Sequence, residues 1–218
     1  MVLPKVNNYL PCQKKGVMYM KIVSKTTFCF LLSVVALNSL VIFNLYAWSG
    51  GPPAYRTGAP EDDGTCNAQG CHNSFSLDSG NAEFTITGPA TYSPGETIKL
   101  KVSFKNDTGT LHGFEMTALD TNDNRIGKFK AIGNTTQVIP VGGSQGLKEE
   151  DAGKYIEHTA TGNKKKKWKI KWTAPSNVSG KITFYAAGND ANGNGNPTGD
   201  HVYTTTMEIN AASAATVQ

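Results

Sequence analysis

The chain has 218 residues, 39% of them hydrophobic, which is enough for one ordinary domain and too few for a multi-span membrane protein. The net charge of +4 is modest. Much of it comes from the run Lys164 to Lys167, so the basic balance is local and argues against a nucleic-acid-binding surface. The 23 glycines predict many turns and few long helices.

Residues 1–49 read as an N-terminal extension with a signal peptide or an anchor. Lys21 and Lys25 precede an apolar run over residues 28–47, and Ala47-Trp48-Ser49 offers small residues where a signal peptidase cleaves. The same run is about long enough to cross a bilayer if it is not cleaved. In either case we expect the remainder to be exported, to a periplasmic, cell-surface or extracellular location that is oxidising.

Residues 50–80 are predicted to be a linker. Gly50-Gly51-Pro52-Pro53 and Gly58-Ala59-Pro60 exclude a helix or a central strand. This linker carries the motif CxxxxCH, which begins at Cys66 and lies ahead of the strands.

The CxxxxCH motif resembles the pattern of covalent haem attachment. Two thiols, Cys66 and Cys71, would add to the haem vinyl groups, and the adjacent His72 would ligate the iron. The usual motif has two residues between the cysteines and this one has four. Gly70 and the small Ala68 allow the longer loop to bulge outward. The alternative is a disulfide between Cys66 and Cys71, with His72 a surface residue.

Residues 81–210 are predicted to form an antiparallel β-sandwich, followed by a frayed tail at 211–218. Alternation of apolar and polar residues marks short strands with turn signals between them. In 97–104 the apolar residues share one face and the lysines the other, and Trp168, Ile170 and Trp172 likewise share a face. The predicted strands are 82–87, 97–104, 114–119, 125–132, 154–159, 168–172, 181–187 and 202–209.

Several stretches together resemble the Reeler (reelin-like) domain, most closely the bacterial type found in exported proteins called choice-of-anchor V. They are Tyr92 to Thr97, His112 to Glu115, Tyr155 to Thr159, Trp168 to Pro175 and Phe184 to Asn189. The glycine-proline segments of the linker and its cysteine-cysteine-histidine motif are part of the resemblance, which spans about 49–209. It implies an immunoglobulin-like β-sandwich and a c-type haem-attachment motif. The cysteine spacing is wider than in the common form.

A haem iron held by His72 has a second axial position, and the axial pair sets the potential. By position, His158 ranks first as the second ligand and His112 is the alternative. His158 sits at a strand end where Reeler domains look similar even without haem, so a structural role is equally open. His201 is also available, and the strand methionines are expected to be core residues.

Two further patterns each have a functional and a structural interpretation, and the structural one is favoured. Asp190 to Gly195 matches the opening of a calcium loop, but His201 stands where the bidentate glutamate is expected, and a turn-rich hairpin is the favoured interpretation. Lys164 to Lys167, with Lys169 and Lys171, is favoured as a solvated strand edge over a docking surface for an acidic redox partner or an anionic surface.

The sequence therefore predicts an exported c-type haem protein with covalent haem c, an electron carrier rather than an enzyme. Its expected partners are a redox partner protein or other haem proteins, with self-assembly also open. No nucleic acid is expected, and contact with a membrane is expected only through an uncleaved N-terminal segment. The alternative function is an extracellular binding or adhesion module with a Cys66–Cys71 disulfide and no haem. Fold alone does not choose between the two.

Overall fold

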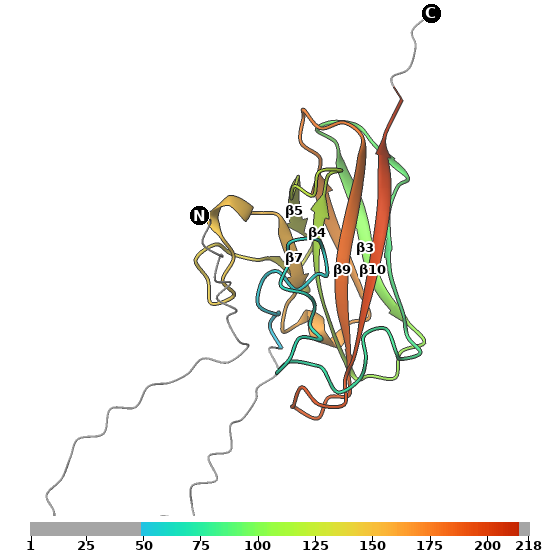
Figure 1. Ribbon diagram of the computed structural model, residues 1–218. Coiled ribbons are helices and arrows are strands. Elements are labelled where there is room, and N and C mark those ends of the chain that lie inside the picture. The colour runs from blue at the N-terminus through green and yellow to red at the C-terminus, as the bar shows by residue number, and fades with distance from the viewer. Residues whose placement is uncertain (1–48, 214–218) are drawn as a thin grey trace, which may run out of the picture.

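The computed structural model describes residues 49–213 as two β-sheets packed face to face (Figure 1). One sheet has four strands in the order β1-β3-β8-β5, and the other has six in the order β2-β10-β9-β4-β7-β6. These strands pair antiparallel except β2 with β10. The strands are β1 (Glu83–Thr87), β2 (Thr91–Tyr92), β3 (Thr97–Lys105), β4 (Leu111–Leu119), β5 (Lys128–Ala131), β6 (Thr136–Val138), β7 (Tyr155–His158), β8 (Lys167–Thr173), β9 (Lys181–Ala191) and β10 (His201–Ala211), with short 3-10 helices η1 (Glu149–Asp151) and η2 (Gly162–Lys164).

The main core lies between the sheets and follows from the alternation. In β8 the buried residues are Trp168, Ile170 and Trp172, at most 1% exposed, while the lysines between them face outward. Residues Ile98, Leu100, Val102 and Phe104 of β3 pack beside them. Burying a side chain of this size stabilises the fold by about 1.5–3 kcal/mol. The predicted β-sandwich is confirmed.

Gly188 of β9 is needed for close aromatic packing in that core. A Cβ at this position would come within 2.6 Å of the Phe84 ring and 2.7 Å of the Phe104 ring. Those two rings lie with their centroids 4.6 Å apart. A larger residue at 188 would therefore force the rings out of the core.

A second, smaller apolar cluster lies on the outer face of the six-stranded sheet. Residues 49–66 lie against this face, so the segment that the sequence marks as a linker packs on the sandwich. It makes no strand, only an isolated bridge between Thr57 and Thr65, as its glycines and prolines predict. The buried residues of this cluster are Ala54, Tyr55, Ile139, Leu147 and Tyr155.

The observed strands match the predicted ones with differences in extent. β4 and β9 are longer than expected, since β4 begins at Leu111 and β9 continues to Ala191. The predicted strand 125–132 is shorter, because Arg125 and Ile126 precede β5. β2 and β6 were not predicted, being only two and three residues long. The predicted signal or anchor at 1–49 lies outside the described residues except for Ser49. Within residues 49–213 no helix is long and apolar enough to cross a membrane.

Candidate functional site

The loop that carries the cysteines closes on itself. The backbone N–H of His72 donates to the carbonyl of Cys66 over 3.0 Å, and Cys71 N–H donates to Ala68 over 2.9 Å. Gly70 has φ +82° and the space where a Cβ would lie is open, so the chain turns there without strain. The residues between the cysteines thus form turns, and the backbones of Cys66 and His72 are held as hydrogen-bonded neighbours.

This loop covers a cavity of about 80 Å³ on the six-stranded sheet. The cavity brings together Cys66 and His72 from the loop and His112 and His158 from the sheet. The other lining residues are Pro52, Leu111, Gly113, Phe114, Asn163, Asn189 and Ala191. Three lining side chains bury an atom that has no hydrogen-bond partner in the described part of the chain: Nδ1 of His112, Oδ1 of Asn163 and Oδ1 of Asn189. Such atoms are costly to leave unpaired, and a polar group bound in this mostly apolar cavity would satisfy those that face it.

The imidazole of His72 is oriented through its Nδ1 atom. This atom lies 2.7 Å from Oδ2 of Asp200, a carboxylate whose side chain is 1% exposed. The amide nitrogen of Asn189 lies 3.1 Å from the same atom. A carboxylate at Nδ1 fixes the ring and makes Nε2 the nitrogen that binds a metal, an arrangement common behind ligating histidines.

His158 is held in a similar way, by the backbone. Its Nδ1 lies 3.1 Å from the amide nitrogen and 3.2 Å from the carbonyl oxygen of Phe114. The Phe114 N–H donates to Nδ1, which leaves the proton of the neutral ring on Nε2. Nε2 has the lone pair that a metal needs only when the proton moves to Nδ1 and faces the Phe114 carbonyl. Burial lowers the pKa of His158 to about 4, with a smaller contribution from the charge of nearby His72. The ring is therefore neutral at neutral pH.

Gly113 makes the room for His158. A Cβ on Gly113 would lie 2.6 to 3.1 Å from three atoms of the His158 ring. The sequence pattern gave no signal for this contact, because the two residues are brought together by the pairing of β4 with β7.

His112, the alternative second ligand, is engaged elsewhere. Its Nε2 lies 2.9 Å from Oδ2 of Asp107 and 3.1 Å from Oδ1 of Asp190. Ligand atoms of these three residues lie within 4.8 Å of one another, the spacing of a metal site. However, Lys166 contacts the same Asp107 oxygen at 2.5 Å, and Asp190 accepts from the backbone N–H groups of Thr108 and Gly109, so both carboxylates already have partners. His201 is outside the cavity and stacks on Phe75 with a centroid distance of 4.1 Å.

The loop after Asp190 is a turn-rich hairpin end, as the favoured sequence interpretation held. The Asp190 carboxylate accepts from the backbone of Thr108 and Gly109. The side chains of Asn192 and Asn194 accept from backbone N–H groups two residues on, and both donate to Thr198. The oxygens of a calcium loop are here used to build turns.

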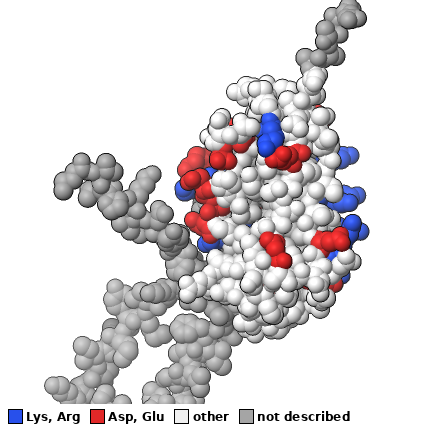
Figure 2. All heavy atoms as spheres, turned by 45° about the vertical axis from the view of Figure 1, so that its right-hand side comes forward, with Lys and Arg blue, Asp and Glu red and all other residues white. Residues whose placement is uncertain are grey.

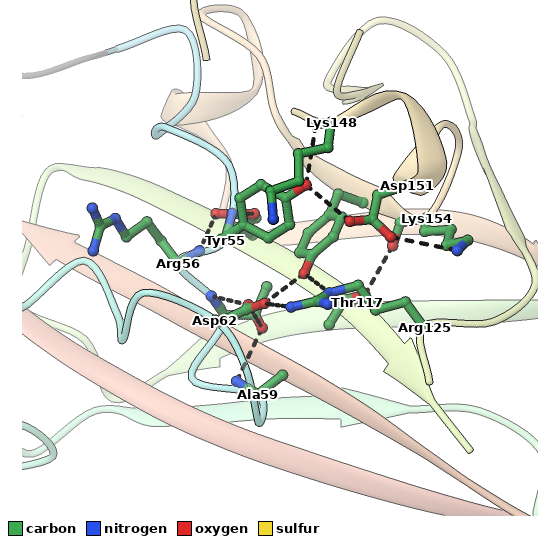
Figure 3. A network of polar contacts seen from close by, with 12 residues as sticks. Tyr55, Arg56, Ala59, Asp62, Thr117, Arg125, Lys148, Asp151 and Lys154 are labelled. Carbon is green, nitrogen blue, oxygen red and sulfur yellow. Dashed lines mark hydrogen bonds and ion pairs between the residues drawn. The ribbon is translucent and has the colours of Figure 1, made fainter. Parts of the chain in front are cut away.

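A buried polar network fixes the segment that leads to the cysteine loop (Figure 3). Asp62 accepts from Tyr155, Arg125 and Thr57, and its side chain is fully buried. Burial and the Asp62 charge raise the pKa of the Tyr155 hydroxyl. The Tyr55 hydroxyl donates to Asp151 over 2.9 Å.

Two buried carboxyl groups lie side by side under the same segment. Glu115 of β4 is the register partner of Glu157 of β7, and both are 0% exposed. Glu115 accepts from the backbone N–H of Tyr55 and of Arg56. Burial, followed by the charges of Asp62 and Glu157, raises the pKa of Glu115 well above its usual value. Burial raises the pKa of Glu157 to about 7, opposed by hydrogen bonds from Gln145 and Gln137.

These contacts include residues that the sequence interpretation missed. Asp200, Asn189, Gly113 and the pair Glu115/Glu157 belong to no site motif, and the two glutamates sit at positions that an alternating strand normally exposes. Gly113 and Glu115 fall within the stretch His112 to Glu115, which the sequence singles out only for its family resemblance.

The Reeler domain family model matches residues 64–188, which is more than half of the chain and includes the cysteine loop. The chain belongs to the Reeler domain family. Reeler domains are typically extracellular β-sandwich modules. Among curated proteins, none matches this chain.

Proposed function

We propose that this Reeler-family chain is an exported c-type haem protein that transfers electrons. Cys66 and Cys71 would be the attachment thiols, and His72 and His158 would hold the iron. The observation that carries the proposal is that His72 and His158, far apart in the sequence, line one cavity beside Cys66, each with its Nδ1 engaged.

The histidine side chains that line the cavity are of the type that ligates a haem iron. His72 would present Nε2 to the iron, and Leu111 supplies part of the apolar lining that tunes a haem potential. His158 would bind through Nε2 once its proton moves to Nδ1, exchanging the bond from the Phe114 N–H for one to the Phe114 carbonyl. The cavity of about 80 Å³ is smaller than a porphyrin. Attachment therefore requires the loop of residues 66–72 to stand further from β4 and β9.

A c-type haem supplies a one-electron couple between ferric and ferrous iron. The chain's own residues would position it. Asp200 would hold the Nδ1 proton of His72, and the backbone of Phe114 would hold His158 at its Nδ1. The unpartnered groups of Asn163 and Asn189 are available for polar contacts at the cavity wall.

The test is to express the full chain in a host that matures c-type cytochromes. The pigment should stay with the polypeptide on a denaturing gel, since two thioether bonds survive denaturant. Cys66→Ala should leave one thioether and shift the pyridine haemochrome band. His158→Ala should convert the low-spin spectrum to a mixed or high-spin one, whereas the control His201→Ala, outside the cavity, should leave it unchanged.

A colourless chain in that host, with a Cys66–Cys71 disulfide found by mass spectrometry, would refute the haem proposal. The chain would then be a binding or adhesion module, the second candidate. A coloured chain whose spectrum is unaffected by His158→Ala would keep the haem and remove His158 as its ligand.

A further inference from the structure

The outer surface of the four-stranded sheet carries eight lysines, here called the lysine face. All eight point away from the core on β3, β5 and β8: Lys99, Lys101, Lys105, Lys128, Lys130, Lys167, Lys169 and Lys171. None of them forms an ion pair within residues 49–213. Lys and Arg side chains project along the right-hand edge in Figure 2, while many acidic side chains lie toward the left.

The register places like charges directly opposite each other. Lys99 and Lys130 both lie opposite Lys171, and Lys101 lies opposite Lys169. Facing cations on neighbouring strands destabilise a sheet. A flat array of this kind that is not neutralised within the chain is complementary to an extended anionic surface.

The residue types at the other outward positions of this sheet indicate which class of partner the lysine face can bind. They are threonines and Ser103, with Glu83 as the acidic one. There is no aromatic or arginine side chain among them to serve as the anchor of a protein interface or to stack on a base. Ammonium groups on flexible stems, without such anchors, suit a plane of hydrated anionic headgroups.

We propose that the lysine face docks the protein on a bilayer that contains anionic phospholipids. The face belongs to the four-stranded sheet and the haem cavity to the outer side of the six-stranded one, so both sheets separate them. Docking therefore leaves the cavity turned away from the bilayer. The inference does not depend on haem.

The test is co-sedimentation of the exported protein with two kinds of vesicle, phosphatidylcholine alone and phosphatidylcholine mixed with phosphatidylglycerol. We expect binding to the anionic vesicles only, weakening as salt is raised. The variant Lys101→Gln/Lys130→Gln/Lys171→Gln should bind about 100-fold more weakly, at about fivefold per lysine. The control Lys148→Gln/Lys154→Gln/Lys181→Gln loses the same charge elsewhere and should bind as the unchanged protein does.

Equal weakening in both variants would overturn the proposal, because net charge alone would then explain the binding. Binding to soluble polygalacturonate but not to the anionic vesicles would overturn it as well and assign the face to an acidic polysaccharide. Equal binding to both vesicles would trace the contact to the N-terminal segment and also refute it. Circular dichroism of both variants would show that their sheets remain folded.

Discussion

Glu157 is a buried carboxyl group whose ionisation opposes the folded state. Its pKa is raised from 4.5 in the unfolded chain to about 7 in the fold, chiefly by burial. The associated stability is therefore fully present below about pH 4.5 and is lost as the pH rises through 7. Since one pKa unit corresponds to about 1.4 kcal/mol, the full loss is about 3 kcal/mol. Glu115, beside it, changes in the same direction.

We predict that Glu157→Gln flattens this dependence. The free energy of unfolding, from urea titrations between about pH 5 and pH 8, should fall by about 3 kcal/mol in the unchanged protein and by clearly less in the variant. At the acidic end the two proteins should be close, because glutamine resembles the protonated acid. If the free energy of unfolding depended on pH equally in the two proteins, ionisation of Glu157 would not destabilise the fold.

A single glycine determines whether the His158 ring can occupy its place. Gly113→Ala puts a Cβ within 2.6 Å of the ring, whereas Gly50 has no atom within 4 Å of a Cβ. We predict that Gly113→Ala lowers stability by about 1–3 kcal/mol, and that Gly50→Ala changes it little. In the haem-loaded protein, Gly113→Ala should also perturb the low-spin spectrum, which a purely structural contact would not do.

At the level of elements, the segment before the cysteine loop is fixed by Asp62. Removing its carboxylate leaves Arg125 half-buried without its partner, which typically costs about 3–5 kcal/mol. We predict that Asp62→Ala lowers stability by that order and speeds amide hydrogen exchange over residues 55–65. Its neighbour Asp63 is exposed, and Asp63→Ala is the matched control, with little effect. If amide hydrogen exchange over residues 55–65 were unchanged in Asp62→Ala, the apolar cluster around Tyr55, and not Asp62, would hold this segment on the sheet.

The elements that the sequence predicted well are those with a complete alternating pattern. β3 and β8 could be predicted directly, because an apolar residue stands at every second position on one face of each strand, as Leu100 does in β3 and Trp172 in β8. β6 could not, because three residues show no period. The packing of residues 49–66 on the sheet was also beyond reach, since it depends on Glu115 and Asp62, polar residues that read as solvent-facing. From the sequence, the candidate site could be proposed only as far as its motif. The placement of His158 in the same cavity as His72 depends on strand pairing, which the motif does not encode.

At the scale of the whole molecule, the net charge of +4 results from an uneven distribution of basic and acidic groups over the two sheets. Eight lysines lie on the outer face of one sheet, and paired buried carboxyls lie under the segment that covers the other. Three like-charge contacts on the lysine face, each costing about 0.2–1 kcal/mol, are left uncompensated within residues 49–213. A surface that is costly for the fold is expected where a partner neutralises it.

The same lysine variant therefore has a second, opposite consequence. We predict that Lys101→Gln/Lys130→Gln/Lys171→Gln raises the free energy of unfolding by about 1 kcal/mol at low salt, because it removes all three facing pairs. The gain should shrink as salt screens the charges of the unchanged protein. Lys148→Gln/Lys154→Gln/Lys181→Gln should give no gain, since Lys154 and Lys181 have acidic partners in Asp151 and Glu208. Thermal unfolding at two salt concentrations measures both effects. If the lysine variant is no more stable at low salt, the facing lysines do not repel one another and the charge argument for the face loses its energetic basis.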